Sequence, residues 1–112
     1  MCIRDRGWVA LKLATNNLKR NGQIKFDPII RHVAAISCGI VDGEPKLDLN
    51  YQEDSAAETD ANFVMDDKGE LIEIQCSAEK KPFSKEEFEI MFSMASEGIR
   101  KIVEIQKSAL DE

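Results

Sequence analysis

The sequence predicts an α+β domain in which a four-stranded sheet packs against helices. Apolar residues recur at helical spacing near both ends of the chain, and short strand-like runs separated by turn signals fill the middle. The second helical segment also carries a complete start signal. At 112 residues, of which 43% are hydrophobic, the chain is long enough for one small domain with one core.

The first helix is expected over residues 7–22. Apolar side chains recur there at Trp8, Leu11, Ala14 and Leu18, with Val9 and Leu13 adding a second apolar side. A helix that is apolar on two sides calls for neighbours on two sides. The segment before it, MCIRDR (residues 1–6), places charges and a cysteine directly ahead of this pattern. We interpret it as a non-native leader and leave it out of the fold prediction.

Four strands are expected over residues 32–41, 45–51, 61–65 and 70–77. Asp42-Gly43 is typical of a tight hairpin between the first two. Alternation in the second places Leu47, Leu49 and Tyr51 on one face, with Asp48 and Asn50 on the other. Residues 52–60 are expected to form a loop or a short helical turn, with Ser55 and Glu58 as its capping box.

The last helix has the clearest signals. Ser84 as N-cap and Glu87 three residues later predict a capping box, and Phe83 and Phe88 suit a hydrophobic staple. Gly98 indicates a close packing contact. The buried face is expected to carry Phe88, Met91, Phe92, Ala95, Ile99, Ile102, Val103 and one polar residue, Gln106.

Charge and cysteine content exclude several classes of protein. A net charge of −6 leaves no surplus of basic residues for non-specific binding to nucleic acid. Three cysteines (Cys2, Cys38 and Cys76), no CxxC pair and a single histidine argue against a structural zinc site. An odd number of cysteines favours a reducing compartment, and no apolar run is long enough to span a bilayer. We therefore expect a cytoplasmic protein with no membrane partner.

The stretch LDLNYQEDSAAETDAN (residues 47–62) has two interpretations. Asp48, Asp54 and Asp60 fall at intervals of six. Such residues are commonplace in solvated turns and caps. Alternatively, a tight turn brings Asp54 beside Asp48, where the pair would bind Mg²⁺ or Mn²⁺ or supply a general acid with a raised pKa. Spacing alone leaves both interpretations open.

LDLNYQEDSAAETDAN, together with EIQCSAE downstream, resembles the C-terminal half of the ribonuclease PH family, the phosphorolytic exoribonucleases also called tRNA nucleotidyltransferases. The similarity extends from residue 7 to about residue 110. It implies the C-terminal half of the ribonuclease PH fold, truncated at the N-terminus. Residues 7–31 would be the end of the first subdomain, and residues 32–110 the C-terminal exoribonuclease subdomain.

The resemblance implies an activity and a site. Members of the family trim the 3′ ends of tRNA precursors with inorganic phosphate as co-substrate, release nucleoside diphosphates and assemble as a hexameric ring of dimers. Asp48 and Asp54 fall on the family's two active-site aspartates, which are expected to be catalytic and to hold Mg²⁺ or Mn²⁺. Asp60 is expected to fix the turn or to support the site from behind.

Two departures from the family pattern affect this interpretation. Cys76 and Ser77 stand where the family has Gly and Thr, so a Cβ is added at a glycine position. The phosphate-binding Gly-Thr-Arg motif would lie just upstream of Gly7, and MCIRDR does not supply it. We therefore expect no phosphate-binding residues in this chain and an inactive fragment.

Two alternative functions remain. One is a non-catalytic RNA-binding or structural subunit like those of the exosome ring, and the other is an unrelated small α+β interaction domain. Outside the acidic stretch we expect His32 to be a surface or capping residue and Cys76 a small buried residue. Lys80 and Lys81 are expected to be solvated.

Overall fold

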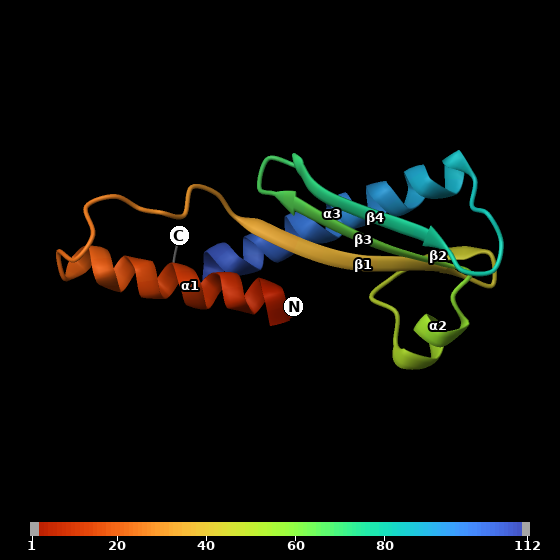
Figure 1. Ribbon diagram of the computed structural model, residues 1–112, viewed down its shortest axis with the longest axis horizontal. Helices are drawn as coiled ribbons and strands as arrows, with labels where there is room; N and C mark the ends of the chain where they lie inside the picture. Colours follow the sequence, from red (N-terminus) through yellow and green to blue (C-terminus); the bar gives the residue numbers. More distant parts are fainter. Residues whose placement is uncertain (1–2, 111–112) are drawn as a thin grey trace.

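The computed structural model describes residues 3–110 as an elongated body of about 54 × 25 × 19 Å (Figure 1). All strand pairs are antiparallel, and the sheet order is β2-β1-β3-β4. The α+β prediction is therefore confirmed. The elements are α1 (Ile3–Arg20), β1 (Val33–Val41), β2 (Glu44–Leu47), α2 (Tyr51–Ala56), β3 (Thr59–Asp66), β4 (Leu71–Ala78) and α3 (Lys85–Ala109).

Helix α3 covers one face of the sheet, α1 lies beside the start of β1, and α2 projects near the end of β2 (Figure 1). The predicted capping box is present at the N-terminus of α3. Ser84 Oγ accepts from Glu87 N at 3.0 Å, and Glu87 Oε1 accepts from Ser84 N at 2.9 Å. These bonds satisfy donors that the first helical turn leaves unpaired. The predicted apolar stripe of α3 then supplies Met91, Ala95, Ile99 and Val103 to the core.

The core forms where α3 meets the central strands. Phe63 is fully buried and packs edge-on against Phe92, with ring centroids 5.9 Å apart. At Gly98 the helix approaches β1 so closely that a Cβ would lie 2.4 Å from Ile36 Cδ1, in line with the close contact expected there. The fully enclosed apolar residues are Ala34, Ile36, Cys38, Ile40, Ala61, Phe63, Met65, Met91, Ala95, Ile99 and Val103.

Gln106 is the polar exception on the buried face of α3. Its Nε2 donates to the carbonyl oxygens of Val33 and Asp5, both at 3.2 Å. The amide therefore joins α3 to β1 and to α1 in one place, where a buried polar group needs hydrogen-bond partners.

The predicted hairpin turn at Asp42-Gly43 is confirmed. Asp42 and Gly43 have φ of 52° and 78°, and Val41 pairs with Glu44. Two positive φ values define the type I′ turn, whose twist suits a two-residue hairpin. The turn from β3 to β4 contains Gly69 at φ 80° and is closed by Asp66, whose Oδ1 accepts from Lys68 N and Glu70 N.

The start of α1 differs from the prediction. The helix begins at Ile3, so the described part of the segment interpreted as a leader forms its first turn; residues 1 and 2, including Cys2, lie outside the described residues. Asp5 is buried, and its Oδ1 accepts from Ala35 N at 3.0 Å. Leu11 and Leu13 remain at least half exposed, so this chain leaves apolar side chains of α1 uncovered.

Three local predictions are also wrong. Strand β2 ends at Leu47, and Tyr51 is the first residue of α2 with 85% of its surface exposed. The capping box of α2 is formed by Asn50 and Glu53, not by Ser55 and Glu58. His32 is buried and packs against the ring of Trp8 at a centroid distance of 4.2 Å, because α1 covers the start of β1.

Membrane insertion has no support in the described helices. Within residues 3–110, no helix is both long enough and apolar enough to span a bilayer.

Asp66 is expected to make stability depend on pH. Burial alone would raise the pKa of Asp66, but hydrogen bonds from Glu70 N and Lys68 N, together with Arg31, outweigh it and hold the pKa below its ordinary value. A depressed folded-state pKa stabilises the protein above the unfolded pKa of about 3.9, and this contribution is lost as the pH falls through the lower folded value.

Asp66→Asn keeps an oxygen for the two backbone donors and removes the charge. We expect the variant to unfold at a lower denaturant concentration than the native chain at pH 7, and the difference to shrink at pH 3. Urea titrations at the two pH values measure this, and a difference that is the same at both would contradict the assignment.

Candidate active site

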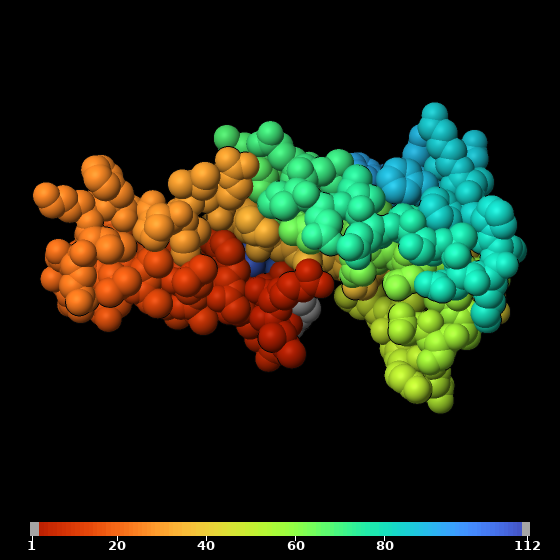
Figure 2. Space-filling view, in the orientation of Figure 1, coloured from red at the N-terminus to blue at the C-terminus, as the bar shows by residue number. Residues whose placement is uncertain are grey.

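The three aspartates of the acidic stretch line one open hollow of about 450 Å³ beside the end of β2. The structure therefore places Asp48, Asp54 and Asp60 around the same hollow. The hollow is lined by Ser37, Asp48, Leu49, Asp54, Asp60 and Asn62. In the space-filling view the surface is indented between the start of α1 and the projecting α2 (Figure 2).

Asp48 is held in an unusual backbone conformation. Its φ is 49°, in the left-handed region of backbone conformation that residues other than Gly, Asn and Asp rarely adopt. Its backbone N donates to Ser37 O at 3.0 Å, so the residue stays attached to β1 after β2 has ended. Strained positions of this kind cluster at functional sites. The turn aims the chain out of the sheet and towards α2.

The side chain of Leu49 packs against β1 at Gly39, which has no side chain to block this contact. A Cβ at position 39 would lie 2.7 Å from Leu49 Cδ1 and 2.5 Å from Thr59 O. Any side chain there would push the turn away from β1. The absence of a side chain at Gly39 therefore sets how closely Asp48 approaches the floor of the hollow.

Helix α2 carries Asp54 and is fixed at both ends. Asn50 Oδ1 accepts from Glu53 N at 2.8 Å, and Lys46 Nζ lies 3.1 Å from Glu53 Oε2. The hydrogen bond from Asn50 N and the contact with Lys46 lower the pKa of Glu53. Because Glu53 is engaged in this cap, the next residue, Asp54, is the one that faces the hollow.

The end of β4 holds the other end of α2. Lys80 Nζ donates to Ala56 O at 3.2 Å, and Lys81 Nζ lies 3.5 Å from Glu58 Oε2. Both lysines are exposed, as expected, and each also contacts the segment that follows Asp54. Each is a surface contact of modest strength.

The floor of the hollow is the sheet itself. Asp60 in β3 pairs with Gly39 of β1, and Asn62 pairs with Ser37 two positions along. Ser37 Oγ donates to Asn62 Oδ1. The sequence analysis did not single out Ser37 or Asn62. Alternation along β3 would have found Asn62, because it shares a face with Asp60 and opposes the buried Phe63.

The hollow suits a hard cation bound by few protein ligands. Within residues 3–110, none of the three carboxylates makes an ion pair or a side-chain hydrogen bond, and no group of three His, Cys, Asp or Glu side chains is arranged to hold a metal by itself. Mg²⁺ commonly takes one or two carboxylates and completes its shell with water and substrate phosphate oxygens. Asp48 and Asp54 fit that donor set.

The cysteines near the hollow are not nucleophiles. Burial raises the pKa of Cys38 to about 12, and Cys76, Asp60 and Asp48 add to the shift. Burial and Asp60 likewise raise the pKa of Cys76. Both remain thiols at neutral pH, and thiols react poorly. Cys76 pairs with Ala61 in regular β register, and among the described non-glycine residues only Asp42 and Asp48 have positive φ. A side chain at position 76 therefore causes no left-handed strain.

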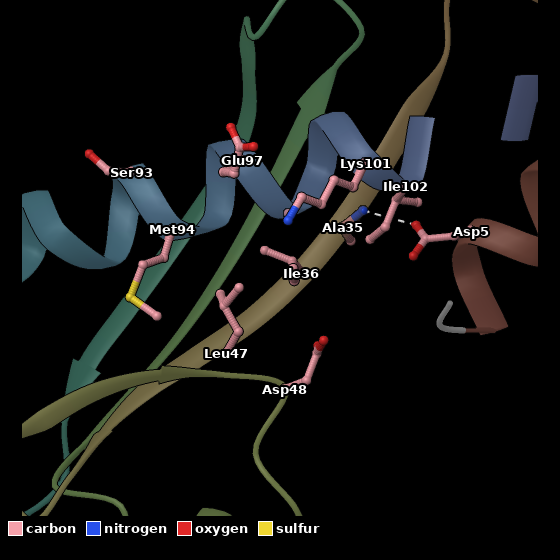
Figure 3. A pocket seen from close by; sticks show the side chains of 11 residues that line it. Asp5, Ala35, Ile36, Leu47, Asp48, Ser93, Met94, Glu97, Lys101 and Ile102 are labelled. Carbon is pink, nitrogen blue, oxygen red and sulfur yellow. Dashed lines mark hydrogen bonds between the residues drawn. The ribbon is translucent and has the colours of Figure 1, made fainter. Parts of the chain in front are cut away.

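A larger cavity of about 790 Å³ lies on the other side of Asp48, between α3 and the strands. Figure 3 shows Asp48 directly after β2, with Leu47 and Ile36 beside it and Asp5 on the helix opposite. Glu97 and Lys101 of α3 also line this cavity. Its remaining lining is chiefly apolar. Of its three carboxylates, Asp5 accepts from Ala35 N and Glu97 pairs with Arg100, which leaves Asp48, the residue that it shares with the smaller hollow.

Comparison with known proteins connects this geometry to a family. Residues 32–98 match the family model described as "3' exoribonuclease family, domain 2", and all six residues of the hollow lie within that match. The chain belongs to this family. The ribonuclease PH resemblance of the sequence is thereby confirmed, and the hollow lies in the family's second domain.

Curated relatives agree. The chain is 48% identical over 103 residues to "Ribonuclease PH" of Caulobacter vibrioides and 52% identical over 104 residues to "Ribonuclease PH" of Cereibacter sphaeroides. These alignments cover 92% and 93% of this chain but only 43% and 44% of the relatives. The chain therefore spans less than half the length of the curated ribonuclease PH proteins that it matches.

Solved structures show the same fold at low sequence identity. The "Archaeal exosome core" superposes with a TM-score of 0.63 at 19% identity, covering 71% of this chain and 32% of that one. The structure titled "archaeoglobus fulgidus exosome with RNA bound to the active site" gives 0.62 at 17% identity, covering 78% and 35%. Similarity at this level establishes the fold of the domain.

Gly39→Ala tests the close approach that positions Asp48. The added methyl group would collide with the backbone oxygen of Thr59 and with Leu49, so we expect a loss of about 1–3 kcal/mol in the free energy of unfolding. We also expect amide chemical-shift changes centred on residues 48–50. Denaturant titration and two-dimensional NMR measure the two effects.

Gly7→Ala is the matched control, because a Cβ at position 7 meets nothing within 4 Å and lies inside α1. It should stabilise the chain by about 1 kcal/mol or less. Equal effects of the two substitutions would contradict the role given to Gly39.

Proposed function

We propose that this chain is the C-terminal part of a phosphate-dependent 3′-to-5′ exoribonuclease that trims tRNA precursors and releases nucleoside diphosphates. The observation that carries the proposal is the convergence of Asp48 and Asp54 on one hollow, in a chain of the 3′ exoribonuclease family. We propose that the complete protein is cytoplasmic. We also propose that it assembles as a homo-oligomer, a hexameric ring of dimers. In such an assembly, the exposed apolar side chains of α1 could pack against other parts of the protein or against a neighbouring subunit.

In the proposed mechanism, Asp48 and Asp54 hold Mg²⁺ or Mn²⁺ and orient the 3′-terminal phosphodiester. A cation held by this pair would supply positive charge to neutralise the charge that develops on the transferred phosphoryl group. Displacement by phosphate breaks the bond from phosphorus to the 3′-oxygen of the preceding nucleotide. The departing 3′-oxygen takes up the proton that the attacking hydrogen phosphate loses. In our proposal Asp48 or Asp54 relays this proton when its carboxylate is not holding the cation. Asp60, on the rigid strand β3, supports the pair from the floor.

The attacking phosphate needs a cationic site of its own. All of the carboxylates around the hollow are acceptors, and the lysines near its rim are engaged with Glu53, Ala56 and Glu58. We infer that the Gly-Thr-Arg motif of the family supplies this site from a segment outside this sequence. The proposed activity therefore belongs to the whole protein.

Metal binding is the first test of the site. We expect Mn²⁺ to bind the chain, and Asp48→Asn or Asp54→Asn to weaken binding by about tenfold or more, because each removes a charged ligand. Electron paramagnetic resonance of free Mn²⁺ measures this directly.

Asp42→Asn is the matched control. Asp42 has a φ of 52°, close to the 49° of Asp48, but lies in the β1–β2 turn outside the hollow. It should bind Mn²⁺ like the native chain. If native and Asp48→Asn chains bind equally, the metal assignment is wrong and a non-catalytic, exosome-like binding role becomes the better hypothesis.

Activity is the second test. The 112-residue chain should release almost no nucleoside diphosphate from a tRNA precursor in phosphate buffer. A chimera in which residues 7–110 replace the matching part of the Cereibacter sphaeroides relative, 52% identical, should be active only with phosphate. In the chimera, Asp48→Asn and Asp54→Asn should each lower turnover by about a hundredfold, and Asp42→Asn should not. A folded chimera that stays inactive would count against the proposed function.

A further inference from the structure

The hollow contains hydrogen-bond donors as well as carboxylates. Three of the six lining residues are aspartates and Leu49 is apolar, so Ser37 and Asn62 are the lining residues whose side chains carry O–H or N–H groups. Nucleotides carry two kinds of oxygen that such a site could bind, those of the ribose hydroxyls and those of the phosphates. Ribose hydroxyls can donate to any of the carboxylates, whereas phosphate oxygens only accept and are repelled by them.

The two donors are already organised with respect to each other. Ser37 and Asn62 are cross-strand partners on the central strands β1 and β3, and Ser37 Oγ donates to Asn62 Oδ1. This bond uses the hydroxyl proton and fixes the orientation of the amide. The Nδ2 group of Asn62 is then left with its two N–H donors, and within residues 3–110 no acceptor is bonded to it.

We propose that Asn62 is a phosphate-binding residue of this site, which donates through Nδ2 to a non-bridging phosphate oxygen of a nucleotide held beside Asp48 and Asp54. Ser37 is the positioning residue that holds the amide in place. The inference rests on the proposed function and adds a substrate contact to it.

Physical reasoning favours a neutral donor here. A lysine or arginine on the floor would pair with the aspartates and compete with the cation for them. An amide bonds to a phosphate oxygen without neutralising the carboxylates that hold the metal. The position on paired central strands also limits its movement, since Asn62 is flanked in β3 by the fully buried Ala61 and Phe63.

The test uses the 112-residue chain with saturating Mg²⁺, which is diamagnetic, and measures binding of ADP by NMR titration. Asn62→Ala should weaken ADP binding by about tenfold, the loss expected for a hydrogen bond to a charged group, and should leave Mn²⁺ affinity within about twofold. Asn21→Ala, an exposed asparagine just after α1, is the matched control and should change neither. Adenosine, which lacks phosphate, should bind native and Asn62→Ala chains equally.

Ser37 gives an independent readout. Ser37→Ala should weaken ADP binding by a smaller factor because the amide loses its orienting bond, and Ser37→Thr should restore binding because the hydroxyl remains. A purely structural role would weaken adenosine and ADP together.

The outcomes separate this inference from the proposed function. Unchanged ADP affinity in Asn62→Ala, an equal loss with adenosine, or no ADP binding by the native chain would each overturn the role of Asn62. The metal assignment would still stand if Asp48→Asn abolished Mn²⁺ binding. Conversely, the native and Asp48→Asn chains could bind Mn²⁺ equally while ADP affinity still depends on Asn62. That result would overturn the metal assignment alone.

Discussion

The packing of α3 against β1 and β3 is the constraint on which the rest of the structure depends. Alternation along the strands sends Ile36, Cys38, Phe63 and Met65 to the helix side, where burial of apolar surface stabilises the fold. The same alternation necessarily turns Ser37, Asp60 and Asn62 to the opposite face. The polar floor of the hollow is therefore the reverse side of the core, and its geometry is as rigid as the sheet.

The walls of the hollow depend on local backbone chemistry. The type I′ turn at Asp42-Gly43 sets the register between β1 and β2, so that Cys38 faces Leu47, where β2 ends directly before Asp48. The bare backbone at Gly39 lets Leu49 close over the sheet, and the capping box of Asn50 and Glu53 starts α2 immediately afterwards. Each device acts over only a few residues, and together they place Asp54 opposite Asp48.

The parts of the fold that could be predicted are those governed by periodicity and by caps. The start of α3 at Ser84, its buried face and the hairpin turn at Asp42-Gly43 follow from patterns a few residues long. The end of β2 could not be predicted, because alternation through Tyr51 looks like a continuing strand and the left-handed turn at Asp48 depends on contacts with Ser37 and Gly39. The burial of His32 likewise depends on α1, which lies distant in sequence.

The site shows the same division. The aspartates stood out in the sequence because their spacing and the family resemblance identified them. Asn62 and Ser37 did not, because cross-strand register, and not sequence spacing, brings them together.

The different backbones of the two aspartates affect how mutations at each would behave in a cell. Asp54 lies in an ordinary helical turn, so most replacements there would alter chemistry and leave the amount of protein unchanged. Asp48 has φ 49°, where a bulky or β-branched residue adds strain of about 1–2 kcal/mol. Losses of that size can lower steady-state abundance several-fold through proteolysis. Under the proposed function, alleles at position 48 would therefore often combine a defective site with a scarcer protein, while alleles at position 54 would yield normal amounts of an impaired one.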